Sequence, residues 1–168
     1  MANLLEEAKL WVGTPYHLGA VKRGVGCDCC TFLVGVMVAC GVLTWEEVDD
    51  IFVDIGYYIP SNRPVRAGLR PLAHDWFANT DVERYLRAVL RCAREIVKTR
   101  CYASVQVKPG SIVLTKAVNS KLWNHGGIVV AWPKIIHSVD PQVVITNASR
   151  DPMWAYRELA VFEVEPTQ

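Results

Sequence analysis

Residues able to do chemistry gather near the start of the chain, where three cysteines surround an aspartate in the order Cys27-Asp28-Cys29-Cys30. Asp28 is a favourable N-cap residue, so a helix is predicted to begin at Cys29. Residues 32–42 are almost all hydrophobic, and a helix that is apolar on nearly every side belongs inside a core. The positive end of the helix dipole stabilises a thiolate at Cys29, which we therefore predict to be a nucleophile.

A cysteine nucleophile needs a base, and a third group must hold that base in the right tautomer. Two of the four histidines, His125 and His137, lie in neighbouring segments that read as strands. If these strands form a hairpin through Trp132-Pro133, both rings can face the helix that carries Cys29. The sequence thus predicts a Cys-His-His constellation of Cys29, His125 and His137.

The pattern along the rest of the chain predicts helices first and strands later. Helices are expected at residues 3–11, 45–52 and 81–98, besides the buried helix that begins at Cys29. Strands are expected at residues 111–115, 125–131, 134–138, 143–146 and 159–164, because short β-rich runs alternate there with turns. This segregation is typical of the α+β class, with N-terminal helices packed on a C-terminal antiparallel sheet.

Two segments between these blocks leave alternatives open. Residues 56–76 contain three prolines, two tyrosines and a tryptophan without clear periodicity, and they suit either the rim or lid of a site or a passive surface excursion. The predicted helix at 81–98 has a basic face, which we interpret as solvated rather than as a surface for an anionic partner.

Composition indicates a compact globular protein of 168 residues, with 51% hydrophobic and 21% charged residues. We expect one domain over residues 1–168, with an inserted loop and helix at about 44–100. Eighteen basic and seventeen acidic residues leave a net charge of +1, which does not favour a nucleic-acid partner. The apolar runs are too short for a membrane span, and the first residues lack a secretory signal, so we expect a protein made in the cytoplasm.

The six cysteines could form disulfides, hold a metal or stay reduced. Reduced thiols are favoured, because the core is large and Cys27, Cys29 and Cys30 are crowded together. Cys40, Cys92 and Cys101 suit small buried apolar positions. Since Cys-x-Cys-Cys does not match the two-plus-two spacing of structural zinc ligands, we predict no metal site and no cofactor.

Five short blocks along the chain share residues with one known family. They lie at residues 11–16, 26–33, 109–114, 125–130 and 135–138. In form and order they resemble the motifs of the NlpC-type peptidoglycan endopeptidases, cysteine peptidases of papain-like fold. The nucleophile block, Gly-x-Asp-Cys followed by two small residues and an aromatic, reads here as residues 26–32. The blocks cover nearly the whole chain apart from about residues 44–100.

The resemblance implies a hydrolase that cleaves an amide in the stem peptide of the bacterial cell wall, between D-γ-glutamate and diaminopimelate or lysine. Cys29 would attack the carbonyl, His125 would shuttle the proton, and His137 would orient His125. Tyr16 and the backbone N–H of Cys29 would stabilise the oxyanion, and Asp28 would help to receive the free amine of the stem.

The chain also departs from the family pattern. Cys30-Thr31 replaces the usual Ser-Gly after the nucleophile, Gly126 replaces a bulkier residue, and Ser111 replaces an aspartate. These departures and the inserted segment resemble the bacteriophage tail-associated branch, which implies other tail proteins as partners and a place in the virion tail. Two alternatives remain: a structural docking module of the tail with little activity, and an acyltransferase of the same broad fold.

Overall fold

The computed structural model describes residues 3–54, 57–58, 70–71, 80–99, 105–116 and 120–164 of the chain. Its helices are α1 (Leu4–Leu10), α2 (Cys29–Ala39), α3 (Trp45–Asp54) and α4 (Thr80–Val89), followed by the 3-10 helix η2 (Leu90–Cys92). Its strands are β1 (Val21–Lys22), β2 (Gly26–Cys27), β3 (Tyr57–Tyr58), β4 (Arg70–Pro71), β5 (Ala93–Thr99), β6 (Ile112–Thr115), β7 (His125–Ala131), β8 (Lys134–Val139), β9 (Gln142–Asn147) and β10 (Leu159–Val164).

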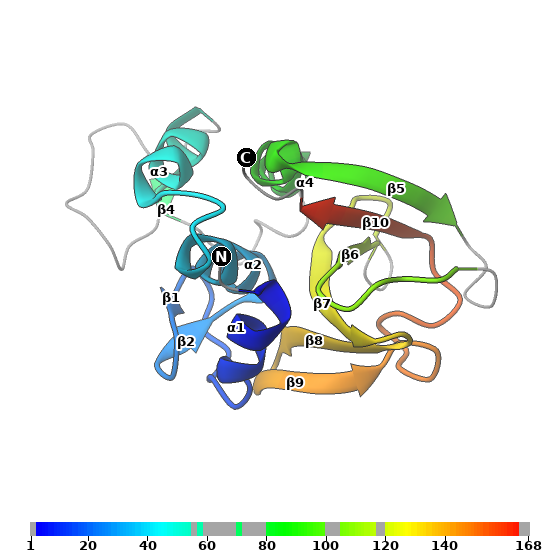
Figure 1. Ribbon diagram of the computed structural model, residues 1–168. Coiled ribbons are helices and arrows are strands. Elements are labelled where there is room, and N and C mark those ends of the chain that lie inside the picture. Colours follow the sequence, from blue (N-terminus) through cyan, green and yellow to red (C-terminus); the bar gives the residue numbers. More distant parts are fainter. Residues whose placement is uncertain are drawn as a thin grey trace.

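One six-stranded sheet organises the molecule, and its strand order is β5-β10-β6-β7-β8-β9 (Figure 1). Every neighbouring pair in it is antiparallel. The helices come before most of the strands and lie against this sheet, so the predicted α+β class is confirmed. Strands β6 to β10 match the five predicted strands to within a residue or so, and β7 and β8 form the predicted hairpin.

Helix α2 is the buried centre of the core, as predicted. Its residues from Cys29 to Met37 are all buried. Glycine permits two close approaches to this helix. A Cβ on Gly126 of β7 would lie 2.6 Å from Leu33 Cδ1, and a Cβ on Gly35 would collide with the ring of Trp11 from α1. Gly126 therefore lets α2 pack directly on the sheet, which explains one departure from the family pattern.

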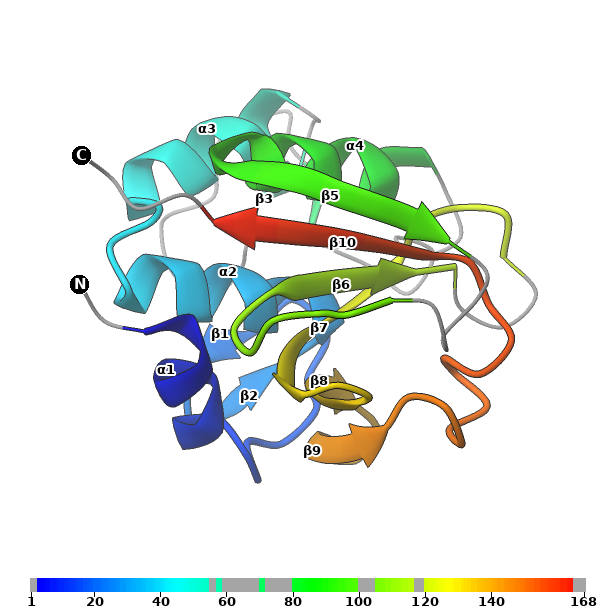
Figure 2. The same cartoon turned by 45° about the vertical axis from the view of Figure 1, so that its right-hand side comes forward.

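Helices α3 and α4 pack into the same hydrophobic core as α2. Figure 2 shows both helices lying along the side of the sheet that carries β5 and β10. α3 begins at the predicted capping box, in which the Thr44 N–H donates to Glu47 Oε2 at 2.7 Å and the Glu47 N–H donates to Thr44 Oγ1 at 3.2 Å. The buried side chains of Phe52 and Leu86 anchor the two helices.

The predicted helix at 81–98 is wrong in its second half. α4 ends at Val89, η2 makes one further turn, and residues from Ala93 onward form the edge strand β5. Ile96, which fitted the apolar stripe of the predicted helix, is 40% exposed. The pairing of β5 with β10, a strand far along the sequence, overrides the local helical periodicity.

Most of residues 56–76, for which a rim or lid was one interpretation, lie outside the described residues. Across the residues that are described, no helix combines the length and the apolar character required to cross a bilayer.

Candidate functional site

Asp28 fixes the position of Cys29 at the start of α2. Asp28 Oδ1 accepts hydrogen bonds from the N–H groups of Cys30 (2.9 Å) and Thr31 (2.8 Å), and the Asp28 N–H donates to Thr31 Oγ1 at 2.8 Å. Asp28 Oδ2 accepts from the N–H of Gly19 at 2.8 Å. The carboxylate thus caps the helix and ties the preceding loop to it, as the sequence predicted for the N-cap.

The Asp28 side chain is fully buried, and burial raises the pKa of its carboxyl while the hydrogen bonds from Thr31, Gly19 and Cys30 oppose that rise. A carboxylate with three backbone donors has a clear structural role. Its predicted contact with the amine of a stem peptide stays a prediction.

Tyr16 lies on the loop between α1 and β1 and forms a β-bridge with Cys27 of β2. Its N–H donates to the carbonyl of Pro141 at 2.7 Å, which holds the loop against the β8–β9 turn. Burial raises the pKa of the Tyr16 phenol, and the nearby Cys29 and Asp28 raise it further. The phenol therefore keeps its proton and remains a hydrogen-bond donor close to Cys29.

His125 and His137 are in direct contact, with 2.8 Å between His125 Nε2 and His137 Nδ1. His125 heads β7, and His137 lies on β8 beside it. Gly127 provides the room for this pair, because a Cβ there would lie 2.8 Å from the carbonyl oxygen of Ile136 and 3.2 Å from His137 Cβ. The ring of Trp154 covers both histidines, at centroid distances of 5.1 Å from His125 and 5.6 Å from His137.

Both imidazoles are held neutral. Burial lowers the pKa of His125, and the neighbouring His137 lowers it further. Burial lowers the pKa of His137 to about 4, although Asp151 acts in the opposite direction. One ring must therefore donate, and the other must accept, in the bond between them.

The tautomers of His125 and His137 are set by which ring nitrogen would accept the proton of the Cys29 thiol. If His125 Nδ1 is to accept a proton, His125 carries its hydrogen on Nε2 and donates to His137 Nδ1. His137 then carries its hydrogen on Nε2, which is buried and has no hydrogen-bond partner among the described residues.

Cys29 approaches the histidine pair through the residue before His125. Cys29 Sγ donates a weak hydrogen bond to the carbonyl oxygen of Asn124 at 3.6 Å. Standard peptide geometry puts that oxygen about 3 Å from the Cα of the next residue, so the sulfur lies at most about 6 to 7 Å from His125 Cα. The structure thus brings His125 and His137 together, and it places Cys29 beside the chain that carries His125.

Sequence reasoning missed three residues of this site. They are Asn124, whose carbonyl accepts from Cys29; Trp154, which covers the histidines; and Ser138, whose hydroxyl donates to the carbonyl of Cys27 at 3.1 Å. None belongs to a pattern that local spacing could have revealed. Of the other two histidines, His17 packs against Gly26, and His74 lies outside the described residues.

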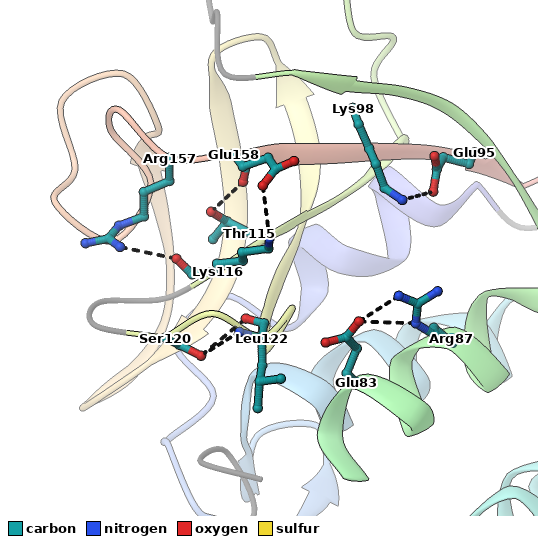
Figure 3. A network of polar contacts seen from close by, with 10 residues as sticks. All are labelled: Glu83, Arg87, Glu95, Lys98, Thr115, Lys116, Ser120, Leu122, Arg157 and Glu158. Carbon is teal, nitrogen blue, oxygen red and sulfur yellow. Dashed lines mark hydrogen bonds and ion pairs between the residues drawn. The ribbon is translucent and has the colours of Figure 1, made fainter. Parts of the chain in front are cut away.

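A pocket of about 240 Å³ lies between α4 and the sheet. Its apolar walls include Leu86, Leu114 and Phe162, and Trp123 closes one side just before Asn124 and His125. Two ion pairs also line it, Glu83–Arg87 on α4 and Glu95–Lys98 on β5 (Figure 3). The pocket is therefore next to the candidate site in sequence, because Trp123 lines it and Asn124 and His125 follow.

Among the described residues, Cys27, Cys29, Cys30, Cys40 and Cys92 form no disulfide, and reduced cysteines stay a prediction from the sequence. Burial raises the pKa of Cys27 to about 12, and burial also raises the pKa values of Cys40 and Cys92. Cys101 lies outside the described residues.

Comparisons with known proteins support the fold. No model of a known protein family matches the sequence, and no curated protein matches it. Among solved structures, the chain is similar to the crystal structure of an N-acetylmuramoyl-L-alanine amidase from Bacteroides uniformis ATCC 8492, with a TM-score of 0.53. The match covers 98% of this chain and 99% of that chain at 10% sequence identity. At that identity the likeness shows a shared fold, and it confirms the predicted papain-type α+β arrangement.

Proposed function

We propose that this protein is a cell-wall hydrolase that cleaves an amide of peptidoglycan, with Cys29 as nucleophile and His125 and His137 as its base and orienting residue. The observation that carries the proposal is the 2.8 Å contact between the two buried imidazoles, next to a cysteine at the head of the central helix. The sequence blocks that resemble the NlpC-type endopeptidases support it. So does the fold shared with a protein named as an amidase.

In the proposed mechanism, Cys29 first turns from the Asn124 carbonyl toward Nδ1 of His125, a tightening that is common when substrate binds. His125 takes the thiol proton and passes it to the leaving amine, as the sulfur forms a bond to the carbonyl carbon and the amide C–N bond breaks. Water, deprotonated by His125, then hydrolyses the thioester.

Two donors are available for the oxyanion of this reaction, the backbone N–H of Cys29 and the hydroxyl of Tyr16. The raised pKa of Tyr16 suits that role, because only the protonated phenol donates. His137 keeps the hydrogen of His125 on Nε2, which leaves Nδ1 as the base.

The test is release of soluble fragments from purified peptidoglycan, followed by mass spectrometry. Cys29→Ala and His125→Ala should abolish release, whereas Cys40→Ala, which removes a thiol remote from the histidines, should retain it. Release by Cys29→Ala at the wild-type rate would refute the proposal, and absence of release by the wild type would favour a docking module without activity.

The scissile bond is the finer part of the proposal. The sequence resemblance points to the bond between D-γ-glutamate and diaminopimelate or lysine, and the name of the solved neighbour points to the N-acetylmuramoyl-L-alanine bond. Fragment masses separate the two, because only cleavage at the second bond releases the whole stem from the sugar.

Selective alkylation tests the nucleophile independently of substrate. The raised pKa values of Cys27, Cys40 and Cys92 make those thiols slow to react with iodoacetamide. Cys29 should therefore be modified first, below neutral pH, as peptide mass mapping would show. Mass spectrometry of Cys29 with candidate acyl donors would separate a hydrolase from an acyltransferase, which leaves a stable acyl-enzyme.

We also propose that residues 1–168 act as one domain, because α3 and α4 bury side chains in the same core as α2. Synthesis in the cytoplasm stays a prediction from the sequence. So does a role in a bacteriophage tail, with other tail proteins as partners, and co-purification with assembled tails would test that role.

A further inference from the structure

The first two residues of α2 present an adjacent pair of thiols. Cys29 Sγ and Cys30 Sγ lie 4.0 Å apart, and one Asp28 carboxylate oxygen lies within 4.8 Å of both sulfurs. All three side chains are buried, with exposed fractions of 4% for Cys29, 1% for Cys30 and 0% for Asp28. The proposed hydrolysis uses only one of the two sulfurs, so the second is unexplained by it.

We propose that Cys29, Cys30 and Asp28 form a chelating site for a soft divalent metal ion such as Zn²⁺, and that the bound ion blocks the nucleophile. This revises the prediction from the sequence, which excluded a metal because the cysteine spacing does not match that of structural zinc sites.

The distances suit zinc. Two thiolates at about 2.3 Å from a tetrahedral Zn²⁺ are about 3.8 Å apart, close to the 4.0 Å that separates the two sulfurs here. A shift of a few tenths of an ångström in the side chains closes the difference. Thiolate sulfur is also the ligand type that selects zinc and other soft ions over magnesium and calcium.

Asp28 can supply the third ligand without releasing the helix. Its Oδ2 accepts one hydrogen bond, from the Gly19 N–H, whereas Oδ1 accepts the two bonds that cap α2. Each carboxylate oxygen has two lone pairs, so Oδ2 keeps one for a metal. Three protein ligands leave a fourth position for water.

A bound divalent ion neutralises most of the charge at the site. Binding converts two thiols to thiolates and releases two protons, so affinity should rise with pH. The two thiolates and the carboxylate give three negative charges against two on the metal. The excess negative charge lies at the N-terminus of α2, where the helix dipole stabilises it.

Metal binding requires only the cluster itself, whereas its inhibitory effect rests on the proposed function of Cys29. Cd²⁺ is the probe, since its thiolate complexes absorb in the ultraviolet in proportion to the number of sulfur ligands. The wild-type chain should bind one Cd²⁺ with the absorbance of two thiolates, and Zn²⁺ should displace it.

Two matched variants decide which thiols bind. Cys30→Ser should weaken Cd²⁺ binding by roughly tenfold or more and halve the absorbance per ion. Cys27→Ser, a change in a buried thiol next to Asp28 but bonded to Ser138, should bind like the wild type. The proposal would be overturned if Cys30→Ser bound Cd²⁺ as tightly as the wild type. It would also be overturned if Cys27→Ser lost as much Cd²⁺ affinity as Cys30→Ser.

A measurement on the wild type covers the case in which Cys30→Ser fails to fold. Cd²⁺ should protect Cys29 and Cys30 together from alkylation, and Cys40 should react at the same rate with or without the ion. Protection of Cys29 alone would contradict a dithiol site.

The inhibitory effect has its own test. One equivalent of Zn²⁺ should stop hydrolysis of peptidoglycan until a chelator removes the ion. If the wild type shows no hydrolysis at all, the proposed function fails, whereas the Cd²⁺ absorbance still decides whether the metal site exists.

Discussion

Acidification should destabilise this protein through His137, and the structure sets the size of the effect. The pKa of His137 is about 4 in the folded chain, because burial disfavours the charged ring, against an unfolded value of 6.5. Below pH 6.5 the unfolded chain therefore binds a proton that the folded chain does not. Stability is lost as the pH falls through the window from 6.5 to about 4, and it is fully present above that window.

Linkage gives the magnitude. Each unit of pKa difference corresponds to about 1.4 kcal/mol, so His137 alone should lower the free energy of unfolding by about 2 kcal/mol at pH 5 and about 3 kcal/mol at pH 4. That is a large share of the roughly 5 to 15 kcal/mol by which such domains are stable.

The assay is urea unfolding of the wild type and of His137→Gln between pH 7 and pH 4. Gln does not titrate, and its carbonyl can accept the hydrogen bond from His125 Nε2. A difference in the free energy of unfolding at pH 7 does not affect the test, because only the change of that free energy with pH is compared between the two proteins. Groups common to both chains, such as Asp28, largely cancel in that comparison. His125 does not cancel, because loss of His137 removes one cause of its lowered pKa, and this adds to the expected difference in the same direction. Parallel loss of stability in the two proteins would show that His137 is not held neutral by burial.

Four further substitutions follow from the geometry. Gly127→Ala should lower stability by about 1 to 3 kcal/mol, because its Cβ would meet the backbone of β8, and it should also impair hydrolysis by separating the histidines. Gly126→Ala should cost less in urea unfolding, since its closest contacts are the ends of the Leu33 and Leu114 side chains and the Val113 carbonyl oxygen lies at an ordinary 3.5 Å; an equal loss in both variants would refute this contrast. Asp28→Ala should cost about 3 kcal/mol or more in thermal unfolding, because three backbone donors lose their acceptor. Ser138→Ala should cost about 1 kcal/mol by the same measurement, since the Cys27 carbonyl loses a buried hydrogen bond, and a neutral result would contradict its importance.

Local signals in the sequence predicted much of the candidate site. The N-cap at Asp28, the unbroken apolar run of α2 and the hairpin that joins His125 to His137 are all short-range features, and the structure contains each of them. Pairing of the two strands allows both rings to face the same way, and in the structure the two rings are in contact. Local patterns of this kind are reliable because a helix cap and a hairpin depend on residues close in sequence.

Features that depend on distant contacts were not predictable. Trp154 covers the histidines from a turn whose sequence has no periodic pattern, and only the tertiary fold brings it there. β5 reads in the sequence as a continuation of α4, since Val82, Leu86 and Val89 establish a helical stripe and Ile96 has the spacing that extends it. Its conversion to a strand comes from pairing with β10, which no local window contains.

The place of β10 in the sheet bears on how the chain folds as it is made. β10 lies between β5 and β6, and Leu159 pairs with Thr99 on one side and with Thr115 on the other. β5 thus pairs with residues 60 to 71 positions later in the chain. During translation its open edge must wait for that strand, and the charges of Arg94, Glu95 and Lys98 along it discourage pairing with other nascent chains. The sheet is then completed by insertion of a late strand between two earlier ones.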